Sequence, residues 1–312
     1  MENVSKTWGV AITCRAPALH ASRALLRRVC ENKVVENRAS MFLRPPSEAF
    51  TVTFGDRAEN EPGMEKIGRI ASAGFSTRDL DACVQRLRER GIASTLVDLR
   101  PLHETPDRAP EAAVLVIPDA VGQLLGEGGV ARVLRELKAM PKDKTTLMRG
   151  RVVTKRARHN NCMADYSQSP DIANGKGTVV DFKDFPALGR LREELALLLQ
   201  PPAPLVGELN HYFDPAVCGI GWHGDAERRL VVGVRLGGAS RDMPLRFRWH
   251  RAATPVGKEG CLVLDEGDVY VMSEKAVGTD WRSNSVDTLR HSTSQQKRRL
   301  DDALGNAHKS RA

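Results

Sequence analysis

The stretch RLVVGVRLGGASRDMPLRFRWH, residues 229–250, contains two apolar segments separated by a turn that begins with Gly-Gly. In the second segment, Leu245, Phe247 and Trp249 alternate with two arginines. An extended chain with this period of two has one apolar face and one charged face, which is typical of a half-buried β-strand. The stretch therefore predicts two short strands joined by a glycine-bearing turn.

Similar short β segments extend on both sides of this stretch, from residue 205 to about residue 292. They include LVGELNHYF, CLVL and VYVMS, and the last two are predicted to form a hairpin around a tight Glu-Gly-Asp turn. Two helices are predicted before them, GVARVLRELKAM and FPALGRLREELALLL. Many short strands behind two helices predict an α+β protein, with a sandwich or jelly-roll barrel and helices packed outside it.

The first 110 residues are predicted to form a smaller region of mixed α/β structure. TVTF and STLVDL are strand candidates, and the segment from Ser76 to Arg90 has a capping residue, an apolar stripe and Gly91 at its stop position. PLHETPDRAPEAA then breaks the pattern with prolines and charges, and predicts a domain boundary. The expected division is 1–110, 111–300 and a polar tail at 301–312.

The composition excludes a membrane-spanning protein. No segment approaches the roughly 20 consecutive apolar residues that cross a bilayer. The formal net charge is +8 and the isoelectric point is about 9.3. This balance permits a polyanionic partner such as nucleic acid, although many basic proteins have none.

The six cysteines are scattered, without a CxxC pair or the spacing of a zinc finger. This usage predicts a reduced intracellular compartment, the cytoplasm or the nucleus. An alternative is a mitochondrial location, because the first 44 residues are rich in arginine, poor in acids and contain ALHASRALLRRVC. The competing interpretation of that segment is a packed helix.

The segment GWHGDAERR, residues 221–229, carries the strongest candidate for chemistry. In an extended strand His223 and Asp225 project to the same face, and Gly224 leaves room for a ligand. A His-x-Asp pair with one distant histidine forms the 2-His-1-carboxylate triad, which binds ferrous iron and leaves positions open. The tripeptide alone also fits a solvated turn, so the interpretation depends on the third ligand.

A suitable third ligand must lie on a later strand, and His291 in VDTLRHS meets this condition. His250 ends the strand PLRFRWH and is predicted to be an exposed or core histidine instead. Upstream, Asn210 and Tyr212 in ELNHYF again lie at positions i and i+2. An amide and a phenol that point the same way can hold a carboxylate by hydrogen bonds. The alternative is an ordinary strand with one core tyrosine.

The order of these motifs resembles that of the AlkB-like family of iron(II)- and 2-oxoglutarate-dependent dioxygenases. The matching blocks are NHYF, IGWHGDAE, VGVRLG, PLRFRW, EGDVYVM and a final histidine. Upstream, RGRVVTKRARHNNCMADY and FPALGRLREELALLL resemble the segments before the core of that family. The resemblance covers about residues 113–300 and does not extend to residues 1–110. It implies a double-stranded β-helix, or jelly roll, with flanking helices.

The resemblance also implies roles for individual residues. His223, Asp225 and His291 would hold iron(II), and Asn210 and Tyr212 would contact the co-substrate 2-oxoglutarate. O2 would be the second co-substrate, and the reaction would hydroxylate a C–H bond. On an N-methyl group such hydroxylation is oxidative demethylation, and the substrate that the resemblance favours is alkylated nucleic acid.

Further roles that the resemblance implies concern the two ends of the site. Arg158 and Asp165 would flank the substrate entrance, and Glu227 would be the acid that reads the substrate. An arginine after the distal histidine would pair with the far carboxylate of 2-oxoglutarate, and Arg298 and Arg299 are the candidates. The sequence departs from the family here, because STSQQKRRL replaces the usual Arg-x-Asn-x-Thr-x-Arg run. KAVGTDWRSNSVD is also inserted before the histidine.

A basic segment, residues 142–158, is the candidate contact for a nucleic acid. It contains a single acid, Asp143. Its basic residues are Lys142, Lys144, Arg149, Arg151, Lys155, Arg156 and Arg158. Such a ridge suits a phosphate backbone, and the alternative is a solvated charged surface. Two other functions stay open: the same chemistry on a protein side chain or small molecule, or an inactive nucleic-acid-binding module, which the missing arginine run favours.

Overall fold

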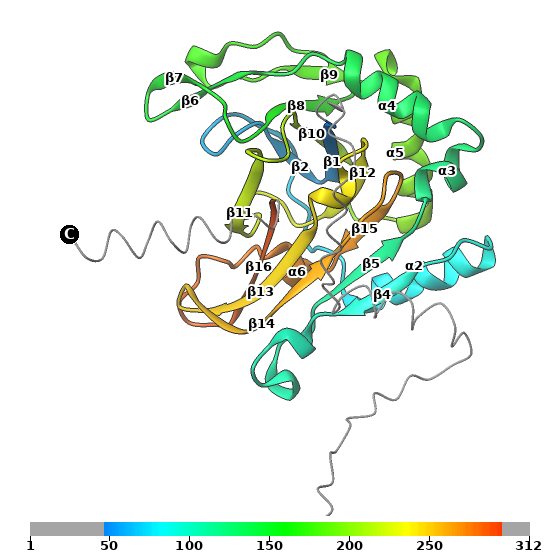
Figure 1. The fold of residues 1–312 in the computed structure, drawn as a ribbon, viewed down its shortest axis with the longest axis vertical. Coiled ribbons are helices and arrows are strands. Elements are labelled where there is room, and N and C mark those ends of the chain that lie inside the picture. Colours follow the sequence, from blue (N-terminus) through cyan, green and yellow to red (C-terminus); the bar gives the residue numbers. More distant parts are fainter. Residues whose placement is uncertain (1–46, 295–312) are drawn as a thin grey trace, which may run out of the picture. The chain divides into compact units, whose positions relative to one another are not determined.

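The computed structural model describes residues 47–294, a mixture of α and β structure in which strands predominate (Figure 1). This agrees with the predicted α+β class. The segment ALHASRALLRRVC, Cys14, Cys30, the polar tail at 301–312, Arg298 and Arg299 lie outside the described residues. In residues 47–294 there is no helix that is both long and apolar enough to cross a membrane.

The larger sheet has the strand order β4-β5-β15-β12-β1-β10-β8-β9. All neighbouring strands are antiparallel except β8 and β9. The bounds are β1 Ala49–Gly55, β4 Thr95–Asp98, β5 Ala113–Ile117, β8 His159–Ala164, β9 Val179–Asp181, β10 Val206–Tyr212, β12 Val231–Leu236 and β15 Val269–Met272.

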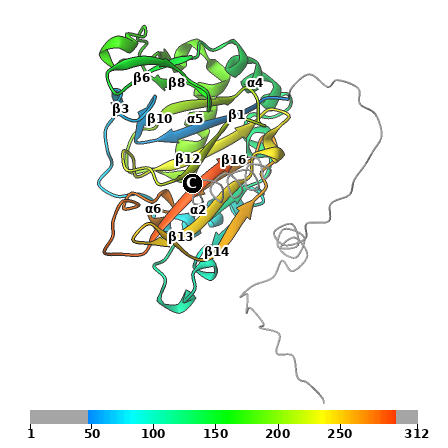
Figure 2. The ribbon, with the colours of Figure 1, turned by 60° about the vertical axis from the view of Figure 1, so that its left-hand side comes forward.

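The smaller sheet has the order β11-β16-β13-β14. The bounds of its strands are β11 Gly219–His223, β13 Leu245–Arg251, β14 Thr254–Leu262 and β16 Thr288–Ser294. Two further pairs of strands, β2–β3 and β6–β7, each form a separate two-stranded sheet. The hairpin strands are β2 Arg57–Glu59, β3 Lys66–Gly68, β6 Thr145–Met148 and β7 Arg151–Thr154. In Figure 2 the strands β10, β1 and β12 lie above β16, β13 and β14.

Helices cover one face of the larger sheet. They are α2 Thr77–Glu89, α3 Ala120–Leu125, α4 Gly129–Ala139 and α5 Pro186–Leu199, with α6 Glu274–Val277 placed before β16. Short 3-10 helices lie between the elements: η1 Arg100–Leu102, η2 Pro106–Arg108, η3 Ile172–Asn174, η4 Phe182–Asp184 and η5 Ser240–Asp242. The predicted helix after residue 76 is confirmed, and Ser76 caps it through a reciprocal capping box with Asp79.

Strand alternation divides the core into two parts. On β1, Phe50, Val52 and Phe54 belong to the core under the helices, whereas Thr51 and Thr53 face the opposite side of the sheet. On that opposite side a second core contains side chains from both sheets. Its largest members include Phe247, Trp249, Tyr270 and Met272. The two sheets therefore pack against each other, and the polar residues of their facing sides border a common space.

The structure corrects the predicted domain boundary near residue 110. β4 and β5, on either side of PLHETPDRAPEAA, are antiparallel neighbours. β1 lies between β10 and β12, in the middle of the larger sheet. The described part of residues 1–110 thus belongs to the same folding unit as the residues that follow. Prolines and charges mark a surface connection here, which local sequence does not distinguish from a linker.

The predicted hairpin in CLVLDEGDVYVMS is also wrong. Both strands exist, but β14 pairs with β13 in the smaller sheet and β15 pairs with β12 and β5 in the larger one. Gly267, with a φ of +91°, lies in the connection between them. The turn therefore carries the chain from one sheet to the other. β14 pairs with the strand directly before it, whereas β15 pairs with strands further away in the sequence.

Candidate metal centre

Two strands of the smaller sheet bring the predicted histidines together. His223 ends β11 and lies directly opposite His291 on β16, and the centroids of the two rings are 4.4 Å apart. Asp225 follows in the loop, where its backbone N–H donates to the carbonyl oxygen of Val277 at 3.0 Å. The structure therefore gathers three residues that are separated by up to 68 positions (291 − 223) in the chain.

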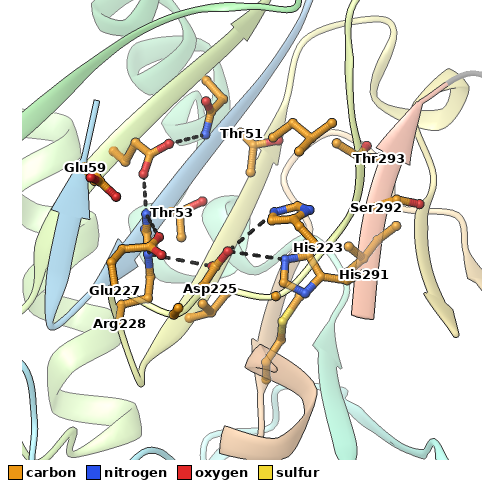
Figure 3. A pocket seen from close by; sticks show the side chains of 18 of the residues that line it. Thr51, Thr53, Glu59, His223, Asp225, Glu227, Arg228, His291, Ser292 and Thr293 are labelled. Atoms are coloured by element: carbon orange, nitrogen blue, oxygen red, sulfur yellow. Dashed lines mark hydrogen bonds and ion pairs between the residues drawn. The ribbon is translucent and has the colours of Figure 1, made fainter. Parts of the chain in front are cut away.

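The donor atoms of these three residues form a compact cluster, shown in Figure 3. The Oδ1 atom of Asp225 lies 3.4 Å from His223 Nε2 and 3.6 Å from His291 Nε2. One ligand atom from each residue lies within 4.8 Å of the others. Ligands bound at about 2.1 Å to one ion lie roughly 3–4 Å apart, so the residues fit a divalent transition metal.

Hydrogen bonding orients His223 toward the cluster. Its Nδ1 atom lies 2.8 Å from the carbonyl oxygen of Gly221 and can donate to it, which leaves the Nε2 lone pair facing Asp225. This is how metal-ligating histidines are usually held. The chemistry of the donor set, two imidazoles and one carboxylate, is that of the facial triad.

The charges of the cluster also suit a cation. Although burial alone would raise it, the pKa of Asp225 lies well below its ordinary value, because both histidines and Arg228 stabilise the carboxylate. Burial and the neighbouring His223 lower the pKa of His291. Burial would lower the pKa of His223 too, but the bond to Asp225 raises it above its ordinary value. The cluster thus holds an ionised carboxylate and a neutral His291, and a bound metal would displace the proton that Asp225 favours on His223.

Asn210 and Tyr212 line the same cavity, which has a volume of about 370 Å³ and is bordered by both sheets. Their side chains share one face of β10, as their spacing predicts. Asn210 Nδ2 donates to Glu208 at 2.9 Å, and Asn210 Oδ1 accepts a hydrogen bond from Arg158 Nε. Tyr212 is almost completely buried.

The structure also places Arg158 and Glu227 at the cavity. Arg158 pairs with Glu61 at 3.4 Å and so joins the β10 face to the loop after β2. Burial and the nearby Asp225 raise the pKa of Glu227. Asp165 does not line this cavity, although it was expected at the entrance. Its carboxylate forms an ion pair with Arg192 at 2.7 Å and is three-quarters exposed.

Arg228 is a buried residue of the cavity wall that the sequence did not reveal. The run Glu-Arg-Arg suggests exposed charges, yet Arg228 is only 4% exposed. Its guanidinium contacts Glu208, lies 3.0 Å from Glu227 and lies 3.7 Å from Asp225 (Figure 3). This buried cation joins a metal-ligand candidate to two acids of the cavity wall. The adjacent Arg229 is partly exposed, as expected of a surface charge.

Arg235 is a second such residue. It lies on β12, is 1% exposed and lines the cavity. A signal for it is present in the sequence, because Val231, Gly233 and Arg235 share one face of a strand whose alternate residues are apolar. An arginine on the inner face of a buried strand requires a specific neighbour.

Gly224 owes its importance to packing rather than to clearance for a ligand. A Cβ atom at this position would lie 2.2 Å from the Gly278 carbonyl oxygen and 2.7 Å from Trp281 Cβ. The segment inserted before His291 therefore lies directly against the loop between the two first ligands. Trp281 and Arg282 of this insertion also line the cavity.

Replacing Gly224 by alanine is expected to lower the free energy of unfolding by about 3 kcal/mol, because the inserted segment must move away. Metal affinity should fall as well, since Asp225 is held by Val277 of that segment. Urea unfolding and metal titration measure the two effects. Gly221→Ala is the matched control, because a Cβ there has no neighbour within 4 Å. Equal stabilities for the two variants would contradict this packing.

The basic segment 142–158 divides into buried and exposed residues. Lys142 is partly buried and Lys155 is buried, and both donate to nearby oxygen atoms. The residues that remain exposed are Lys144, Arg149, Arg151 and Arg156, on or beside the β6–β7 hairpin. Figure 1 shows this hairpin projecting beyond β8. The exposed positive charge is therefore smaller than the sequence indicates.

Lys155 should make stability depend on pH. Burial lowers the pKa of Lys155 from 10.5 to about 8, so between these values the unfolded chain holds a proton that the folded chain has lost. Stability then rises with pH across this window, by about 3 kcal/mol in total. Urea unfolding of wild type and Lys155→Met from pH 7.5 to 10.5 measures the difference. Lys144→Met, at an exposed lysine, should follow the wild type, and parallel curves for all three proteins would refute the shift.

Comparison with known proteins gives one informative match. No protein-family model matches the chain. The chain is similar to a protein of Acanthamoeba polyphaga mimivirus named Uncharacterized protein R156, with 37% identity over 250 residues. The match covers 80% of this chain and 97% of the viral protein. That name states no activity, so an assignment of function has to be argued from the geometry of the site.

Proposed function

The chain belongs to the family of the mimivirus protein R156, and we propose that it is an AlkB-like iron(II)- and 2-oxoglutarate-dependent dioxygenase. The observation that carries this proposal is the cluster of His223, Asp225 and His291 at the wall of a cavity between two sheets. A divalent metal held by three protein ligands keeps other coordination positions for a co-substrate and oxygen.

The strand arrangement supports a double-stranded β-helix for the core. The four central strands of the larger sheet, β10-β1-β12-β15, pack on the four of the smaller sheet, β11-β16-β13-β14. The consecutive strands β10 to β13 alternate between the two sheets, as the strands of a jelly roll do. We propose that β1 completes this core from the N-terminal side, since it fills the place between β10 and β12.

The residues of the chain would divide the work as follows. His223, Asp225 and His291 would hold iron(II), and Asn210 and Tyr212 would contact 2-oxoglutarate. Bound iron(II) with 2-oxoglutarate supplies the oxidation of a substrate C–H bond by O2, with release of succinate and carbon dioxide. Arg228 keeps the Asp225 carboxylate ionised and oriented.

Alkylated nucleic acid is the substrate class that we propose, with oxidative demethylation as the reaction. The exposed cations Arg149, Arg151 and Arg156 support a contact with phosphates. Met148 and Val152 on the same hairpin are about half exposed, and apolar side chains of this kind can contact bases. A protein side chain or a small molecule remains the second candidate, because the cavity itself has a size typical of small-ligand sites.

Turnover of 2-oxoglutarate tests the chemistry. Purified protein with iron(II), ascorbate and 2-oxoglutarate is expected to release succinate even without substrate, and His223→Ala should not. Equal succinate from the two proteins would refute the dioxygenase. An Arg149→Gln/Arg151→Gln variant separates the substrate classes, because it should weaken salt-dependent binding of single-stranded DNA and RNA. Wild-type protein that binds neither at low salt would favour the second class.

A further inference from the structure

We infer that Arg235 on β12 binds the far carboxylate of 2-oxoglutarate, in the role that the sequence assigned to Arg298 or Arg299. This inference rests on the proposed function and names the residue that selects a dicarboxylate. Arg235 belongs to a different strand, on the other sheet from the distal histidine. The cavity wall buries this arginine without an anion.

The guanidinium of Arg235 lacks the partners that a buried cation needs. Only 1% of the residue is exposed, and its Nε and Nη1 atoms have no hydrogen-bond partner in residues 47–294. Its Nη2 atom makes one long contact, 3.4 Å to the hydroxyl of Thr293. No carboxylate of the described chain pairs with it. A buried charge without a counterion is costly, so the site is built to receive an anion.

The register of the sheets places this cation beside the proposed co-substrate contacts. Thr51 on β1 lies directly opposite Arg235 on one side and Asn210 on the other. These three residues thus form one row across three strands, on the face that lines the cavity. The row therefore places the unused Nε and Nη1 donors of Arg235 beside the proposed co-substrate contacts.

The guanidinium of Arg235 also lies close to the metal-ligand candidates, through its contact with β16 of the smaller sheet. Its contact, Thr293, follows His291 by two residues on β16 and faces the same cavity. Two residues along a strand span roughly 6.6–6.8 Å. A short diacid can therefore reach from the metal cluster to Arg235. The planar fork of an arginine binds both oxygens of a carboxylate at once.

Of the other arginines of the cavity, Arg282 is exposed and the remaining two are already engaged. Arg228 is neutralised by three acids, and Arg158 pairs with Glu61 and Asn210. β1 lies between β10 and β12, and its residues that face the cavity are Thr51 and Thr53. This strand therefore contributes no arginine that could bind the far carboxylate. Among the described arginines of the cavity, Arg235 is the buried one without a carboxylate partner.

Binding of two 2-oxo acids tests the assignment without turnover. Manganese(II)-loaded protein is titrated without oxygen by calorimetry, with 2-oxoglutarate and with 2-oxobutyrate, which lacks the far carboxylate. Wild type should bind 2-oxoglutarate much more tightly than 2-oxobutyrate. Arg235→Met should lose about 100-fold in affinity for 2-oxoglutarate and keep its affinity for 2-oxobutyrate. Arg235→Lys should fall between, because it keeps the charge but not the fork.

A matched variant and a stability measurement control for damage to the fold. Arg246→Met removes another buried arginine, which donates to the Ser294 carbonyl oxygen at 3.1 Å and does not line the cavity. It should leave the ratio of the two affinities unchanged. Arg235→Met without metal should unfold at a temperature no lower than that of the wild type, because an unpaired buried charge has been removed.

The result that would overturn the role of Arg235 differs from the result that would overturn the proposed function. If wild type and Arg235→Met bind 2-oxoglutarate equally well, the assignment of Arg235 is overturned and the proposed function stays intact. The same holds if Arg298→Gln/Arg299→Gln, instead of Arg235→Met, loses the preference for 2-oxoglutarate. Metal-loaded wild type that binds neither acid overturns the proposed function, and the role of Arg235 with it.

Discussion

Replacing His291 by alanine is expected to lower the affinity of the protein for manganese(II) by at least about 100-fold. His291 supplies one of three donor atoms, and its Nε2 atom lies 3.6 Å from the Asp225 carboxylate that shares the cluster. Two ligands cannot hold a divalent ion as three do, because each remaining bond must compete with water. Calorimetry measures the affinity, and the rise in unfolding temperature on adding metal gives a second reading.

His250→Ala is the matched control for this variant. His250 is also buried, and it lies on β13, the strand next to β16 in the same sheet. Its Nδ1 atom lies 3.1 Å from the Arg248 carbonyl oxygen, and it is not one of the clustered donors. Both variants create a cavity in the same layer, but only His291→Ala should lose the metal. Similar metal affinities for the two variants would remove His291 from the site.

Replacing Arg228 by methionine is expected to lower the free energy of unfolding by about 4 kcal/mol. The substitution leaves the carboxylate of Glu208, which is only 5% exposed, without its cation. Asp225 and Glu227 lose the same positive charge. Burying three carboxylates together without a cation is far more costly than losing a surface ion pair. Urea unfolding of the metal-free protein measures the effect.

The neighbouring arginine provides the comparison. Arg229 is partly exposed and lies 3.7 Å from Glu274, so Arg229→Met should cost less than about 1 kcal/mol. A Glu208→Gln/Arg228→Met double variant should be less destabilised than the sum of the single variants, because the unpaired acid is then neutral. If Arg228→Met and Arg229→Met lose the same stability, the buried network does not exist in solution.

Local periodicity was sufficient to predict most elements. The alternation of Leu245, Phe247 and Trp249 with arginines does correspond to β13, and these three side chains are buried. The predicted triad residues also come together, because β11 pairs with β16 and Asp225 follows β11 directly. Whether they bind iron(II) stays a prediction.

Pairing between distant segments was not predictable in the same way. CLVL and VYVM look like a hairpin because a turn separates them, yet β14 pairs with the preceding strand β13, and β15 pairs with the more distant strands β12 and β5. Arg228 looked like a solvated charge because its immediate neighbours are charged, and only Glu208 on another strand explains its burial. Both errors have one cause: a local pattern records which faces are apolar, but not which partner covers them.

The central place of β1 affects how the chain folds. Its two partners lie about 150 and 180 residues further along the chain, because β1 begins at residue 49 and pairs with β10 and β12. A ribosome must therefore release most of the protein before the sheet can close around its first described strand. Loop-closure entropy delays such non-local pairing, and two unsatisfied sheet edges stay exposed in the meantime. Folding should be slow and prone to aggregation, and a chain that starts at residue 111 should not fold at all.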